Sequence, residues 1–194
     1  MYEYLSGEYV TKTPTHVVID VQGVGYYVHI SLNTFSDIKE LKGGKLFISF
    51  QVREDAQTLF GFSKVEERHL FENLISVSGI GPNTGRMILS SMTPDELQTA
   101  IVTGNVSALK SIKGIGPKTA QRMILELQDK LNKSGSVTGA FPSAGINLAL
   151  DEAATALVLL GFVKAQVDKC LGAIAKDSPT LGVEGFIKEA LKRL

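Results

Sequence analysis

The sequence GIGPNT at residues 79–84 decides the fold of this chain, because it returns at residues 114–119 as GIGPKT. An apolar stretch with helical spacing precedes each copy, and the apolar stretch MIL follows each of them, at residues 87–89 and 123–125. A Gly-x-Gly link permits backbone angles that a Cβ atom forbids. The repeat therefore predicts a helix, a tight glycine turn and a second helix, made twice.

The residues of each turn predict what it buries and what it exposes. Ile80 and Ile115 are apolar and should point inward. Pro82 and Pro117 suit the first position of a helix, where the missing N–H is no loss. Glycine N–H groups are then left unpaired at a helix N-terminus, which attracts phosphate. Two such turns in tandem predict a grip on a nucleic-acid backbone that does not read bases.

The charge near the turns differs between the two copies. Lys118 follows the second turn and shares a helix face with Arg122. In the first copy Asn83 stands in place of the lysine and leaves Arg86 as the nearby cation. A single turn of this kind is more often only a turn, and these cations could be a solvated face, but two equally built copies favour DNA contact. The residues expected to contact the DNA backbone are Gly79, Gly81, Asn83, Thr84, Arg86, Gly114, Gly116, Lys118, Thr119 and Arg122.

The composition limits the other functions that the chain can have. The formal net charge is zero over 194 residues, so phosphate binding must come from local geometry and a few placed cations. The one cysteine and three scattered histidines give no zinc spacing, and we expect neither a metal nor a cofactor. The sequence shows no secretory signal and no membrane-spanning stretch, which predicts a cytoplasmic protein without membrane contact.

Residues 1–63 predict a small β-barrel within a chain of the α+β class. Apolar residues alternate from Val17 to Val21 and again from Val24 to Ile30, which is the period of half-buried strands. Five short strands in so few residues indicate an OB-like barrel. The other expected elements are strands around residues 4–11, 46–52 and 59–62 and a short helix near residues 35–41.

Two groups of polar and aromatic residues within this barrel have alternative interpretations. Glu54 and Asp55 fall between two strands, so they should project from a hairpin tip, where an acidic pair is usually only solvated. Tyr26, Tyr27 and His29 could form a stacking platform for bases. Core packing of the first and surface placement of the other two are the favoured interpretation.

The rest of the chain predicts a helical domain, a linker and a small terminal unit. Residues 64–132 should hold both glycine turns, with Thr93 as the cap of a helix. The Gly/Ser-rich residues 133–147 predict a flexible linker. Residues 148–194 predict a three-helix, UBA-like unit, which is small enough that docking a partner is its expected use. Its expected core residues are Leu157, Leu160, Phe162, Ile187 and Leu191, and the alternative is that some of them are exposed for a partner helix.

This arrangement resembles the RuvA family of bacterial Holliday-junction-binding subunits over the full chain. The segments that carry the resemblance are GVGY at 23–26, VREDAQ at 52–57, LFGF at 59–62, both GIGP turns and ALVLLGF at 156–162. The resemblance implies a tetramer, or two face-to-face tetramers, whose concave face holds a four-way DNA junction open. It also implies that the hairpins hold the minor-groove backbone of each arm.

The resemblance also implies roles for residues that the turns do not explain. Glu54 and Asp55 match an acidic pin that repels phosphates at the crossover and helps the strands to separate. The implied partners are the hexameric ATPase RuvB and the RuvC resolvase, in homologous recombination, DNA repair and the SOS response. The residues at positions that match the RuvB docking surface are Leu157, Leu160, Phe162 and Leu191.

We expect no catalytic site in this chain. The sequence has no G-x-x-x-x-G-K-[ST] phosphate-binding loop and no recognisable nucleophile–base pair, so ATP hydrolysis should come from the partner. Two alternatives remain. One is a helix-hairpin-helix repair enzyme such as a glycosylase, for which too little sequence is left to build a catalytic domain. The other is a protein–protein scaffold without DNA, which bulkier residues at Gly114 and Gly116 would distinguish.

Overall fold

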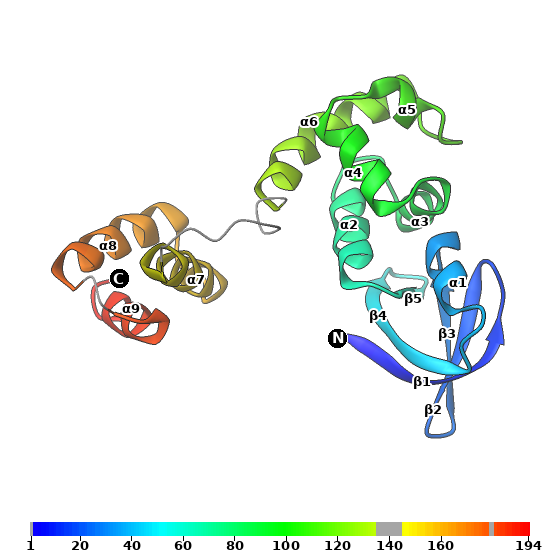
Figure 1. Cartoon of the computed structure of the whole chain (residues 1–194), viewed down its shortest axis with the longest axis horizontal. Coiled ribbons are helices and arrows are strands. Elements are labelled where there is room, and N and C mark those ends of the chain that lie inside the picture. Colours follow the sequence, from blue (N-terminus) through cyan, green and yellow to red (C-terminus); the bar gives the residue numbers. More distant parts are fainter. Residues whose placement is uncertain (1, 135–144, 179–180) are drawn as a thin grey trace. The chain divides into compact units, whose positions relative to one another are not determined.

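The computed structural model describes residues 2–134, 145–178 and 181–194, which form two compact units, Met1–Thr138 and Gly139–Leu194 (Figure 1). The middle of the predicted linker, residues 135–144, lies outside the described residues. The last helix of the first unit extends to Ser134, and the first helix of the second unit begins at Gly145.

The first unit begins with a closed five-stranded barrel in the order β1-β2-β3-β5-β4, which confirms the OB-like prediction (Figure 1). β3 and β5 pair in parallel, and the other neighbours are antiparallel. Val17, Ile19 and Val28 are fully buried, as the alternation predicts. The barrel elements are β1 (Tyr4–Lys12), β2 (His16–Val21), β3 (Val24–Ile30), α1 (Leu32–Ile38), β4 (Gly43–Val52) and β5 (Gln57–Phe62).

Five helices complete the first unit and form both predicted hairpins. α2 and α3 flank residues 79–81, and α5 and α6 flank residues 114–116. Thr93 begins α4 with a capping box, in which its hydroxyl accepts from the Glu96 N–H and the Glu96 carboxylate accepts from the Thr93 N–H. The helices are α2 (Val65–Ile75), α3 (Pro82–Ser91), α4 (Pro94–Val102), α5 (Val106–Lys110) and α6 (Pro117–Ser134).

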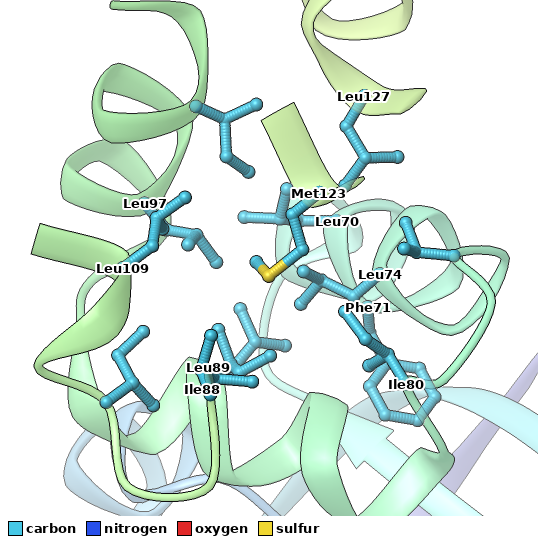
Figure 2. Packing of buried hydrophobic residues seen from close by; sticks show 14 of the residues in the cluster. Leu70, Phe71, Leu74, Ile80, Ile88, Leu89, Leu97, Leu109, Met123 and Leu127 are labelled. Atoms are coloured by element: carbon cyan, nitrogen blue, oxygen red, sulfur yellow. The ribbon is translucent and has the colours of Figure 1, made fainter. Parts of the chain in front are cut away.

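One apolar core unites the two hairpins. Figure 2 shows Met123 of α6 among leucine and isoleucine side chains from α2, α3, α4 and α5. Ile80 and Ile115 are 4% and 5% exposed, so the residue between the glycines points inward in both copies. Phe60 and Phe62 of β5 extend this core into the barrel, with ring centroids 5.1 and 5.0 Å from that of Phe71. The barrel and the helical domain therefore share packing, which fixes one on the other.

The second unit is a bundle of three helices, α7 (Gly145–Leu159), α8 (Lys164–Asp177) and α9 (Val183–Leu191). Leu157 is fully buried in its core, and Phe162 and Ile187 are partly buried against it. The predicted placement of Leu160 and Leu191 in the core was wrong, because these side chains are 62% and 47% exposed. Leu160 lies beyond the end of α7, just before Gly161 turns the chain with a φ of 100°.

Candidate nucleic-acid interface

The two glycine turns, hairpin 1 (residues 79–84) and hairpin 2 (residues 114–119), have the same backbone geometry. The first glycine of each, Gly79 and Gly114, has a φ of 93° or 88°, a left-handed conformation that favours glycine. In hairpin 1 the Ile80 N–H donates to the Val77 carbonyl at 3.0 Å, and in hairpin 2 the Ile115 N–H donates to the Ile112 carbonyl at 3.1 Å. Both following helices begin with proline and close their first turn on the second glycine carbonyl at 2.9 Å.

Each hairpin presents unpaired backbone donors at a helix N-terminus. Among the described residues, no acceptor faces the N–H groups of Gly79, Gly81, Asn83 and Thr84 in hairpin 1 or Gly114, Gly116, Lys118 and Thr119 in hairpin 2. Neither Gly79 nor Gly116 would bring a Cβ atom within 4 Å of another group, so open space lies beside these donors. Free N–H groups at the positive end of a helix, with room for a ligand, suit an oxygen anion such as a backbone phosphate.

The three predicted cations lie in different surroundings. The Lys118 side chain is exposed beside hairpin 2. Arg122 does not only face solvent, because its Nη1 donates to the Ser78 carbonyl, 3.1 Å away, at the entry to hairpin 1. Arg86 is held by the barrel, since its Nη1 donates to the Thr15 carbonyl at 2.9 Å. Hairpin 1 therefore lacks the freely exposed cation that hairpin 2 has in Lys118.

The predicted acidic residues lie at the turn between β4 and β5, where Glu54 and Asp55 are both exposed. The Arg53 N–H donates to the Ala56 carbonyl at 2.8 Å and closes this turn. We call Glu54 and Asp55 the acidic tip. A pocket of about 220 Å³ lies between this turn and hairpin 1, and its lining includes Arg53, Asp55 and Asn83. The acidic tip and hairpin 1 thus belong to one surface.

Hairpin 1 is anchored to the barrel through α1. Asn33 Nδ2 donates to the carbonyls of Leu89 and Met92 at the end of α3, at 2.6 and 2.9 Å. The Leu32 N–H donates to the Ser90 hydroxyl at 3.1 Å. With the Arg86 contact, these bonds fix α3 at its middle and its end. They determine how far hairpin 1 lies from the acidic tip.

A buried carboxylate adds a second anchor between the barrel and α2. Glu67 accepts from the Ser31 hydroxyl at 2.5 Å and from the Thr34 hydroxyl at 2.7 Å, and it is only 2% exposed. Burial raises the pKa of Glu67, although both hydroxyls act in the opposite direction. The Thr34 hydroxyl also accepts from the Ser63 N–H, so one network joins α1, α2 and the end of β5.

Tyr26, Tyr27 and His29, the suggested stacking platform, do not form an open row of exposed rings. Tyr26 packs against the barrel core. Tyr27 is half-exposed and already stacks on His16, with ring centroids 4.4 Å apart. His29 is partly buried, and burial together with the Arg86 charge lowers its pKa below the usual 6.5. Surface placement of Tyr27 agrees with the favoured interpretation.

The predicted docking residues of the second unit divide between surface and core. Leu160 and Leu191 are exposed, Phe162 is partly buried, and Leu157 is a core residue with 0% exposure. The neighbouring apolar residues that are also exposed are Val158, Leu159, Val163 and Leu194. The sequence pattern did not single out these four residues.

The part of the chain that the structure describes contains no group of three or more His, Cys, Asp or Glu side chains that could hold a metal ion. None of its helices is long and apolar enough to cross a membrane.

An OB-like barrel joined to two equivalent glycine hairpins defines the class of tandem helix-hairpin-helix proteins. Residues 71–129 match the family described as SAM-like helix-hairpin-helix tandem. Residues 1–61 match the RuvA N terminal domain, and residues 148–194 match the RuvA C-terminal domain. The chain belongs to the RuvA family.

Relatives of similar length support this assignment. A protein of Bacteroides thetaiotaomicron is 49% identical over the whole of both chains, and one of Parabacteroides distasonis is 48% identical over the whole of both. A protein of Cytophaga hutchinsonii is 46% identical over 99% of each chain. All three are named Holliday junction branch migration complex subunit RuvA.

Proposed function

We propose that this chain binds four-way Holliday-junction DNA by shape and recruits a RuvB ATPase that drives branch migration. One observation carries the proposal: hairpin 1 and hairpin 2 present two equivalent sets of unpaired N–H groups on one compact unit. Such sets grip backbone phosphates whatever the base sequence. The names of the RuvA relatives agree with this role.

The acidic tip gives the proposal its junction specificity. Glu54 and Asp55 would repel phosphate, which opposes simple duplex binding but suits a crossover where strands must part. In this proposal they act as the acidic pin, with four copies of the chain, or two such tetramers, placed around one junction. Arg86 then supports hairpin 1 from the barrel side, and Lys118 contacts phosphate directly.

The second unit supplies the proposed contact with RuvB. Leu160 and Leu191 are the exposed apolar groups of the predicted set, and Leu157 supports them from the core. In this proposal RuvB hydrolyses the ATP, and this chain binds the junction and orients RuvB on it. RuvC resolvase would act on the same junction, and the setting is the cytoplasm.

A competition gel shift tests the proposal. A synthetic four-way junction competes against linear duplex of the same arm sequence, across a salt titration. Strong junction preference at moderate salt is expected, because only a shaped surface distinguishes substrates with the same backbone chemistry. Equal affinity for both would reduce the chain to a general backbone binder and remove the role of the acidic tip.

A further inference from the structure

The two hairpins differ in the cation that each can offer to a phosphate. Hairpin 2 has exposed Lys118 directly after its turn, whereas hairpin 1 has Asn83 at that position. The sequence suggests Arg86 as a substitute, but its guanidinium donates to the Thr15 carbonyl and lies 3.3 Å from His29 Nδ1. Nη1 of Arg86 is thus engaged with barrel groups, and a second cation beside hairpin 1 would face the phosphate more directly.

Arg53, at the base of the acidic tip, lies where that charge is needed. Its Nη2 atom is 3.7 Å from the point that a Cβ atom on Gly81 would occupy. Gly81 caps α3, and its N–H is one of the unpaired donors of hairpin 1. Arg53 also lines the pocket of about 220 Å³ together with Asn83.

The other charged and titratable groups of this pocket do not replace Arg53. Burial and the Arg86 charge lower the pKa of His29, which disfavours a positive charge on its ring. Within the described residues, the Arg53 guanidinium makes no ion pair or hydrogen bond with a protein group, although Asp55 lines the same pocket. Its N–H donors are thus available to an incoming ligand.

We infer that Arg53 supplies the phosphate-binding cation of hairpin 1, acting across the boundary between barrel and helical domain. A guanidinium beside free backbone N–H groups can hold two oxygens of one phosphate. This inference rests on the proposed function. It adds that the turn carrying the repelling Glu54 and Asp55 also carries an attracting group, which fixes the position of a bound arm relative to the acidic tip.

The test compares four full-length proteins with the unsubstituted chain in fluorescence anisotropy, on a four-way junction and on linear duplex, across a salt titration. Arg53→Gln removes the charge, and Asn83→Lys adds to hairpin 1 the cation that hairpin 2 has. The double variant Arg53→Gln with Asn83→Lys tests rescue. Lys42→Gln is the matched control, because Lys42 is exposed at the other end of β4, roughly 30 Å away along ten residues.

We expect Arg53→Gln to weaken junction binding roughly tenfold and to lower the salt slope by about one unit for each bound protomer. Asn83→Lys should restore that slope in the double variant, and Lys42→Gln should change neither quantity. An unchanged slope in Arg53→Gln would overturn the inference, and so would a lowered slope that Asn83→Lys does not restore.

The same data keep this inference separate from the proposed function. Phosphate contact occurs on duplex as well as on a junction, so the Arg53→Gln slope can be read on either substrate. If the unsubstituted chain bound linear duplex as tightly as the junction, the proposed function would be overturned. Equal slopes for Arg53→Gln and Lys42→Gln, with junction preference intact, would overturn the role of Arg53 alone.

Discussion

Arg122 of α6 donates a hydrogen bond from Nη1 to the carbonyl of Ser78, 3.1 Å away and 44 residues earlier in the chain. Ser78 directly precedes Gly79, so a side chain from the helix of hairpin 2 holds the entry to hairpin 1. Arg122 Nε also lies 3.9 Å from Oε1 of Glu126, one turn further along α6. This bond links the two hairpins at the surface, in addition to the apolar core that they share.

Arg122→Met should therefore affect DNA binding more than stability. The variant keeps the aliphatic stem but loses the bond to Ser78, and because the side chain is half-exposed the loss should be under about 1 kcal/mol. Junction affinity should fall several-fold, because the variant removes a positive charge and the surface link between the two hairpins. Isothermal titration of a junction and thermal unfolding measure the two effects. A large loss of stability would mean that Arg122 is mainly structural.

Lys118→Ala should weaken DNA binding without affecting the fold. The side chain is exposed and directly follows the turn of hairpin 2, so its removal leaves the apolar core unchanged. We expect the salt slope of junction binding to fall by about one unit for each bound protomer, evenly across DNA sequences. Anisotropy on two junctions of different arm sequence checks this. A changed base preference would contradict a backbone contact.

The two glycines of hairpin 2 should separate folding from binding. Gly114 has a φ of 88°, and a Cβ there would lie 3.3 Å from Met87 Cε, so Gly114→Ala should cost about 1–2 kcal/mol of stability. Gly116 has no positive φ and no group within 4 Å of a Cβ position. Gly116→Ala should keep stability and lose affinity, because the methyl group occupies the phosphate's approach. Full affinity in a folded Gly116→Ala protein would show that this turn does not contact the DNA.

Glu67 should make the stability of the first unit depend on pH. Because burial raises its pKa, the folded state holds this proton more tightly than the unfolded state. The stability that it contributes is present below the unfolded pKa and is lost as the pH rises through the folded pKa. In Glu67→Gln, which stays neutral, the free energy of unfolding should fall less between about pH 4.5 and neutral pH than in the unsubstituted chain.

Tyrosine fluorescence can follow this unfolding in the first unit alone. All five tyrosines lie within residues 2–27, and the chain has no tryptophan. Glu66→Gln removes a charge from an exposed position one residue away on α2 and is the control. Parallel pH profiles for Glu67→Gln and the unsubstituted chain would show that Glu67 keeps the same proton affinity when folded and unfolded.

In the second unit, Leu157→Ala should mainly affect stability, and Leu160→Ala should mainly affect partner binding. Leu157 is fully buried, so Leu157→Ala should lower the stability of this unit by about 2–5 kcal/mol. Leu160 is 62% exposed, so Leu160→Ala should leave the helices folded and reduce stimulation of the RuvB ATPase. Circular dichroism and an ATPase assay with RuvB and junction DNA measure both. Full stimulation by Leu160→Ala would place the docking surface elsewhere.

The sequence by itself determined the local elements of this protein. A Gly-x-Gly-Pro turn needs only a few adjacent residues, so both hairpins and their buried isoleucines could be predicted from spacing. The same holds for the Thr93 cap and for the alternation of the barrel strands. In the second unit the local pattern was insufficient, because Leu157 and Leu160 have the same residue type and only the end of α7 separates core from surface.

The tertiary structure alone decided which distant groups meet. Arg53 reaches Gly81 and Arg86 bonds Thr15 because β5 packs its phenylalanines against α2, which joins the barrel to the helices. Arg122 bonds Ser78 because α6 packs on the core that α2 and α3 share. No spacing in the sequence encodes these meetings, since each joins residues separated by 28 or more positions whose distance depends on the packing of the elements between them. The turns are local backbone chemistry, whereas the charges around them are placed by the fold.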